Sequence, residues 1–87
     1  MTLIIYETFG SPEDSKRVEE IQVDDQTTLE QLKIVISQID AFKEREIDLN
    51  KMRIRDRGGI FVFGKIYRQL NTTLKKEKLR NWGEIAV

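Results

Sequence analysis

The side chains that could carry chemistry in this 87-residue chain are carboxylates, hydroxyls, lysines and arginines, because the sequence contains neither cysteine nor histidine. Ser11, Ser15 and Ser37 therefore lack the base that usually activates a serine nucleophile. The acidic pairs Glu19–Glu20 and Asp24–Asp25 are adjacent in sequence, so in a strand their carboxylates point to opposite faces. No Gly-Lys-Ser/Thr sequence leads into a helix to bind a phosphate. We therefore expect no enzyme active site, no cofactor and no metal site within these residues.

The most distinctive charged feature is a segment of alternating basic residues in the second half of the chain. Its basic members are Lys51, Arg53, Arg55 and Arg57, with Lys65 and Arg68 beyond them, and a period of two places the first three on one face of a strand. Residues 1–50 contain 12 acidic and 5 basic residues, and residues 51–87 contain 3 and 10, so the halves carry −7 and +7. We predict that the first four of these side chains bind an acidic partner, either another protein or another domain of the parent chain. The alternative is that they only solubilise an exposed strand or protect a sheet edge.

The sequence leaves open two further roles for these basic residues. Nucleic-acid binding usually adds stacking aromatic side chains, and Phe61, Phe63 and Tyr67 lie near the basic segment, so weak nucleic-acid binding is a less favoured alternative. A domain with acidic and basic edges could also assemble head to tail, although we expect a monomer. Trp82 has two interpretations: it covers the open end of a small core, which we favour, or it is an exposed binding anchor.

The element around which the fold must be organised is a helix predicted over Thr27–Ile39. Its apolar residues recur at the spacing of one helix face: Leu29, Leu32, Ile36 and Ile39, with Val35 widening the stripe. Two overlapping capping boxes mark its start: Thr27 with Glu30, and Thr28 with Gln31. A single helix of about 12 residues is marginal alone. We therefore expect it to pack across one face of a sheet.

The remaining apolar runs are short and alternate in the way that strands do. The predicted strands are Thr2–Phe9, Arg17–Val23, Lys51–Arg57, Ile66–Leu70 and Glu84–Val87. The residues expected to point into the core are Leu3, Ile5, Ile21, Val23, Met52, Ile54, Ile85 and Val87.

The connecting segments carry turn residues and a few apolar anchors. Gly10–Ser15 and Gly58-Gly59 are predicted as turns. Asn71–Leu79 is predicted as a turn of α-helix or 3₁₀-helix opened by a threonine cap. Ile60–Phe63 either pairs back on the preceding strand or forms a loop over the end of the core. The irregular segment after the helix is expected to be anchored beneath it by Phe42, Ile47 and Leu49.

Length and composition bound the class of protein. Eighty-seven residues with 39% hydrophobic content and one proline are expected to form a single globular domain, residues 1–87. No apolar run approaches 18 residues and no signal-peptide pattern is present, so we expect neither a membrane span nor secretion. The absence of cysteine fits a reducing compartment, and we expect an intracellular location, cytoplasmic or nuclear.

With the order of elements in place, two groups of residues resemble ubiquitin-like domains. The first is the strand-to-helix junction, with Val23, Thr28-Leu29, Leu32-Lys33 and Ile36. The second is the closing segment, in which Thr73-Leu74 is followed by Leu79, Ile85 and Val87. The third strand and this ending are most similar to ubiquitin-like modules embedded in ubiquitin-specific proteases, which are deubiquitinases. In those enzymes the catalytic cysteine and histidine belong to a separate domain, which agrees with the lack of both residues here.

The resemblance implies an α+β β-grasp fold, with a mixed sheet of four or five strands in the order 2-1-5-3-4 and one main helix on one face. It also favours Thr28 as the helix N-cap. It implies a non-catalytic interaction or regulatory module of the ubiquitin pathway. Conjugated relatives end in Gly-Gly, whereas this chain ends at Val87 and has an internal Arg57-Gly58-Gly59. Since Arg53 and Arg55 stand where ubiquitin presents apolar residues, standard ubiquitin receptors are not expected to bind.

Overall fold

The computed structural model describes residues 1–8, 15–45, 48–57 and 64–87. Within these ranges it contains the following elements: β1 Thr2–Glu7, β2 Lys16–Gln22, α1 Leu29–Ser37, α2 Asp40–Lys43, β3 Ile54–Asp56, β4 Ile66–Tyr67 and β5 Gly83–Ala86. The predictions made for residues 10–14, 47 and 58–63 lie outside the described ranges. The segment expected to be irregular after the main helix contains the short helix α2, which the sequence analysis missed.

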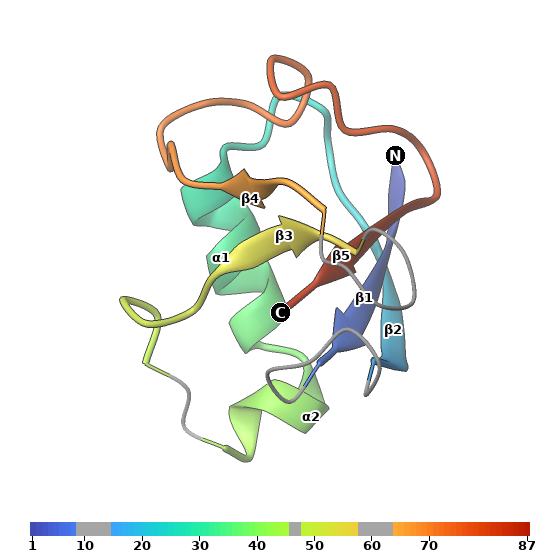
Figure 1. Cartoon of the computed structure of the whole chain (residues 1–87), viewed down its shortest axis with the longest axis vertical. Coiled ribbons are helices and arrows are strands. Elements are labelled where there is room, and N and C mark those ends of the chain that lie inside the picture. The colour runs from blue at the N-terminus through green and yellow to red at the C-terminus, as the bar shows by residue number, and fades with distance from the viewer. Residues whose placement is uncertain (9–14, 46–47, 58–63) are drawn as a thin grey trace.

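The strands form one mixed sheet in the order β2-β1-β5-β3-β4, as the resemblance implied. Strand β1 is parallel to β5, and the pairs β1–β2, β3–β5 and β3–β4 are antiparallel. Helix α1 lies across one face of this sheet (Figure 1). The fold is therefore α+β, with a mixed five-stranded sheet and one main helix on one face, as in a β-grasp.

The core lies between α1 and the inward face of the sheet. Leu32 and Ile36 of α1 are completely buried. The sheet residues predicted to face the helix are buried as well: Leu3, Ile5, Ile21, Ile54 and Ile85. The prediction that Val35 widens the apolar stripe is wrong, because Val35 is exposed and Lys33, on the opposite flank of the stripe, is buried instead. Its ammonium donates a hydrogen bond of 3.2 Å to the carbonyl of Leu49, so the chain after α2 covers that flank.

The first amide groups of α1 are bonded by a distant part of the chain. The N–H of Leu29 donates to the carbonyl of Thr72 and that of Glu30 to the carbonyl of Leu70, both at 3.0 Å. The N–H of Gln31 donates to Oγ1 of Thr28 at 3.2 Å, and the Gln31 side chain accepts from the Thr28 N–H at 2.9 Å. The capping box is thus the one that begins at Thr28, and the amides that a helix start usually leaves without an intrahelical partner are bonded.

Replacing Thr28 with alanine is expected to lower the free energy of unfolding by about 1 kcal/mol, because the N–H of Gln31 loses its acceptor. Thr28→Ser retains an acceptor and should cost less. Thr27→Ala is the matched control, since the capping box does not use the Thr27 side chain. Urea denaturation of the three variants measures the difference, and an equal loss for Thr27→Ala and Thr28→Ala contradicts the assignment.

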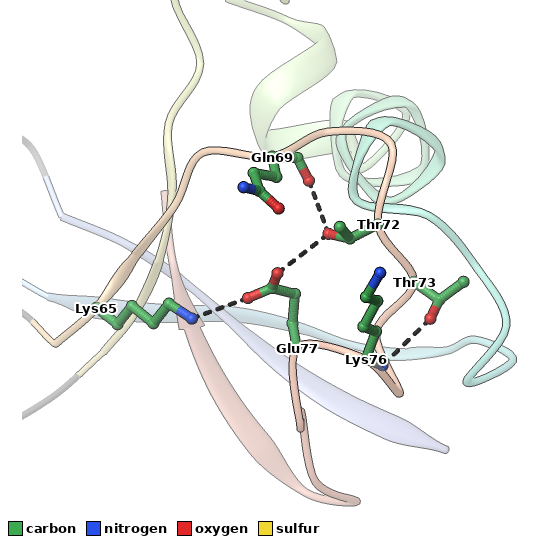
Figure 2. Close-up of polar contacts among 6 residues, drawn as sticks. All are labelled: Lys65, Gln69, Thr72, Thr73, Lys76 and Glu77. Carbon is green, nitrogen blue, oxygen red and sulfur yellow. Dashed lines mark hydrogen bonds and ion pairs between the residues drawn. The ribbon is translucent and has the colours of Figure 1, made fainter.

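The segment that caps α1 is held by a polar cluster around Glu77 (Figure 2). The Glu77 carboxylate accepts a hydrogen bond from Lys65 Nζ at 2.9 Å. The Thr72 hydroxyl has one proton and two acceptors within reach: the Gln69 carbonyl at 2.8 Å and Glu77 Oε1 at 3.2 Å. The hydrogen bond from Lys65 is the main cause that lowers the pKa of Glu77, so the carboxylate stays charged. Thr73 accepts from the N–H of Lys76 at 3.2 Å, as a threonine cap would, but the segment forms hydrogen-bonded turns in place of the predicted α-helical or 3₁₀ turn.

Candidate protein-binding surface

Three of the four basic residues predicted to bind a partner line one hollow of about 440 Å³ beside the end of β5. They are Lys51, Arg53 and Arg55. A further cation, Arg45, lines the same hollow and comes from the segment after α2. The acidic side chains of the hollow are Glu7 and Asp48, so four cationic side chains face two carboxylates and the net side-chain charge is +2. Its apolar lining includes Phe42 and Met52. We call this the basic hollow.

Strand β3 and its approach position the basic residues of the hollow. Met52 and Ile54 are buried, so alternation turns Arg53 and Arg55 to the other face of the sheet. Arg53 is exposed, whereas Arg55 is half-buried beside β5, where it pairs in register with Ala86. The strand is shorter than predicted, and Lys51 precedes it in a turn. Only part of this basic group is therefore fully open to water.

Sequence reasoning missed the contribution of Arg45. Its guanidinium forms an ion pair with Glu7, whose side chain is only 8% exposed. Glu7 occupies an inward position of β1, following the alternation of Leu3 and Ile5. The ion pair places a fixed positive group at the border of the hollow, and it joins the segment after α2 to the sheet. No pattern in the sequence indicates that residue 45 returns to β1.

Arg57 lies apart from the basic hollow. Its Nη1 is 2.6 Å from Oε2 of Glu84 on β5, and its Cζ lies 4.1 Å from the ring centroid of Tyr6 on β1. These contacts belong to the outer face of the sheet, where the neighbouring carboxylate neutralises much of the Arg57 charge. Of the four predicted residues, Arg57 is therefore the least available to an acidic partner.

The basic surface continues from the hollow toward β4. Arg53 also lines a second hollow of about 230 Å³, together with the exposed Arg68. Lys65 does not take part in this surface, because it pairs with Glu77 and its Nζ lies 5.5 Å from the ring centroid of Tyr67. The positive charge that a partner meets is thus contributed by Lys51, Arg53, Arg55 and Arg68, and in part by Arg45, whose charge is offset by its ion pair with Glu7.

Two apolar residues do not lie where the sequence analysis placed them. Trp82 is 57% exposed, so the favoured prediction that it covers the core is wrong. Leu79 and Met1 pack against the core from its margin instead. Leu49 is also exposed, and the anchor beneath the helix is Phe42, which is 2% exposed.

The sequence matches no protein-family model and no curated protein. Neither helix of the described part of the chain is both long and apolar enough to span a membrane.

Proposed function

We propose that this chain is a non-catalytic, ubiquitin-like interaction module of a larger ubiquitin-pathway enzyme, most similar to the modules of ubiquitin-specific proteases. It binds an acidic segment, either of another protein or of another domain of its own parent chain. The observation that carries this proposal is the basic hollow, in which four cations from two separate segments surround one concave surface. The β-grasp order of the sheet supports the ubiquitin-like part of the proposal.

The physical basis of recognition is electrostatic. Exposed lysines and arginines steer an oppositely charged partner and set its orientation, and their attraction weakens as salt is added. The ion pair between Arg45 and Glu7 fixes one cation in place before binding, which lowers the ordering cost of association. The same charges replace the apolar patch that ubiquitin receptors require, so the module is expected not to bind those receptors.

Replacing Lys51 and Arg53 together with glutamate should weaken binding of a glutamate-rich peptide more than replacing both with glutamine does, because repulsion is added to the lost attraction. Both side chains are exposed, so the fold should survive with a change within about 0.5 kcal/mol. An NMR titration at two salt concentrations measures the affinity and locates the contact. Lys16→Glu is the control, because it reverses an exposed charge on β2, at the sheet edge away from β3 and outside the basic hollow.

The expected chemical-shift changes centre on residues 51–55 and on Arg45. Chemical-shift changes confined to Ile4 and Tyr6, with no change at Arg53, contradict the assignment of the basic hollow as the binding surface. A full-length protein without a protease domain contradicts the deubiquitinase part of the proposal and leaves the binding part intact.

Self-assembly is a second candidate, and the sheet order favours it to a smaller extent. Strand β2, with the exposed Glu19 and Glu20, lies at one edge, and β4 lies at the other, next to β3 and its basic residues. Glu20 is already paired with Arg17 on the same strand, which reduces the acidity of that edge. Salt-sensitive oligomers in light scattering support assembly, and a concentration-independent monomer excludes it.

A further inference from the structure

Trp82 is the single tryptophan of the chain, and it is more exposed than the other large apolar side chains that the structure describes. It is not among the partly buried side chains that pack against the core. Exposing a large aromatic ring to water forgoes the free energy of burying it. Packing within the described part of the chain therefore does not account for the position of this ring.

The backbone holds Trp82 in a conformation that residues other than glycine rarely adopt. Its φ is +66°, in the left-handed region. Three hydrogen bonds fix this geometry: the Trp82 N–H donates to the Thr2 carbonyl at 2.6 Å, the Thr2 N–H donates to Asn81 Oδ1 at 2.7 Å, and the Gly83 N–H donates to the Arg80 carbonyl at 2.9 Å. Strain that is retained in this way at an exposed residue is characteristic of functional positions.

The residues before Trp82 form a rigid, basic turn. The N–H of Leu79 donates to the Leu74 carbonyl and that of Lys78 to the Lys75 carbonyl, both at 3.0 Å, with Lys78 at φ +62°. This is the Schellman pattern, which usually places glycine where Lys78 stands. Segment 75–82 exposes the following cations, all within seven positions of Trp82 in the sequence: Lys75, Lys76, Lys78 and Arg80.

Some of the carboxylates near this segment are paired with residues outside it. Glu77 is turned toward Lys65 and Thr72 (Figure 2), and Glu84 is paired with Arg57. Asp56 lines a hollow with Lys78 and Arg80, and Asp24 and Asp25 line another with Lys75. With the paired Glu77 and Glu84 set aside, the four cations of segment 75–82 outnumber these three carboxylates, so the segment keeps a small excess of positive charge.

We propose that segment 75–82 is a second protein-docking surface, which binds an acidic peptide that carries one apolar side chain. The apolar side chain packs on Trp82, and the flanking carboxylates meet the lysines. Tryptophan and arginine are enriched among the residues that dominate protein interfaces. Single-stranded nucleic acid is less well matched, because successive bases stack on several aromatic rings and segment 75–82 offers one. This surface does not depend on the basic hollow, since Trp82 precedes β5 and the hollow lies at the opposite end of that strand.

The fluorescence of Trp82 reports on this surface alone, because the chain has no other tryptophan. The probes are a glutamate-rich peptide with a central leucine, the same peptide with alanine in place of leucine, and an oligothymidylate. The leucine peptide is expected to shift the emission to shorter wavelength at lower concentration than the alanine peptide. Absence of a shift with both peptides, or tighter binding of the oligothymidylate, overturns the proposal.

Variants separate a binding role from a structural one. Trp82→Gly, made in the Lys51→Glu, Arg53→Glu background so that the basic hollow does not contribute, should weaken binding of the leucine peptide about tenfold or more in calorimetry. The denaturation midpoint should stay equal to that of the background or rise, because glycine adopts positive φ freely. A lower midpoint assigns Trp82 to the structure and overturns the proposal. The double variant Lys76→Glu, Lys78→Glu keeps the ring and should also weaken binding. The double variant Lys51→Glu, Arg53→Glu should leave this binding unchanged, and if it abolishes the shift, the peptide occupies the basic hollow instead.

Discussion

Replacing Leu32 or Ile36 with alanine is expected to lower the free energy of unfolding by about 2–5 kcal/mol. Both side chains are completely buried between α1 and the sheet. Alanine leaves a cavity that the surrounding strands can fill only in part, so lost transfer free energy and lost packing add together. Small domains have a total stability of about 5–15 kcal/mol, so either change removes a large fraction of it and could unfold the protein.

Urea or guanidinium denaturation followed by circular dichroism measures this loss. Ile34→Ala is the matched control, because Ile34 lies on the same helix and is 48% exposed. Its truncation should cost much less than that of Leu32. Losses well under about 1 kcal/mol for both core variants contradict the placement of the helix on the sheet.

Replacing Phe42 with alanine is expected to lower the free energy of unfolding by a similar amount, about 3–5 kcal/mol. Phe42 is the buried residue of α2, a helix of four residues that is too short to be stable without tertiary contacts. The chain that follows carries Arg45, whose N–H donates to the Phe42 carbonyl at 3.1 Å. Removing the ring should therefore destabilise the fold and also loosen the ion pair between Arg45 and Glu7.

Phe42→Leu tests whether the effect comes from the lost volume, because leucine refills much of the space and should restore a large part of the stability. Lys43→Ala, at an exposed position of the same helix, is the surface control. Denaturation curves and the NMR signals of Arg45 report the two effects. If Phe42→Ala leaves both the stability and the Arg45 signals unchanged, α2 does not anchor the basic hollow.

The sequence predicted those features that depend on local periodicity. The apolar spacing of α1 and the alternation of β1 and β3 identified most of the buried apolar residues, because a side chain on a regular element can face only a limited set of directions. The sequence offered two candidate capping boxes, beginning at Thr27 and at Thr28, and the structure contains the one that begins at Thr28. The sheet order followed from the resemblance and is confirmed.

The features that were missed depend on which distant segment covers a given face. Val35 and Lys33 lie on opposite flanks of the α1 stripe, roughly 90° and 70° from its centre at 3.6 residues per turn. The Lys33 flank is buried because the chain near Leu49 passes over it. Arg45 joins the basic hollow through a pairing with β1, and the exposure of Trp82 follows from a backbone φ that no composition rule predicts.

The position of β5 has a consequence for how this protein folds. Among the described strands, β5 alone joins the β1–β2 pair to the β3–β4 pair, because it lies between β1 and β3. Its partner on β1 is far away in the chain: Leu3 pairs with Gly83, which is 80 positions later. Two-stranded ribbons are marginal in water on their own, and closing so long a loop must be accomplished before the pairing stabilises the sheet. The sheet therefore becomes a single cooperative unit only when its last strand inserts at its centre, which makes that insertion the slow, non-local step of folding.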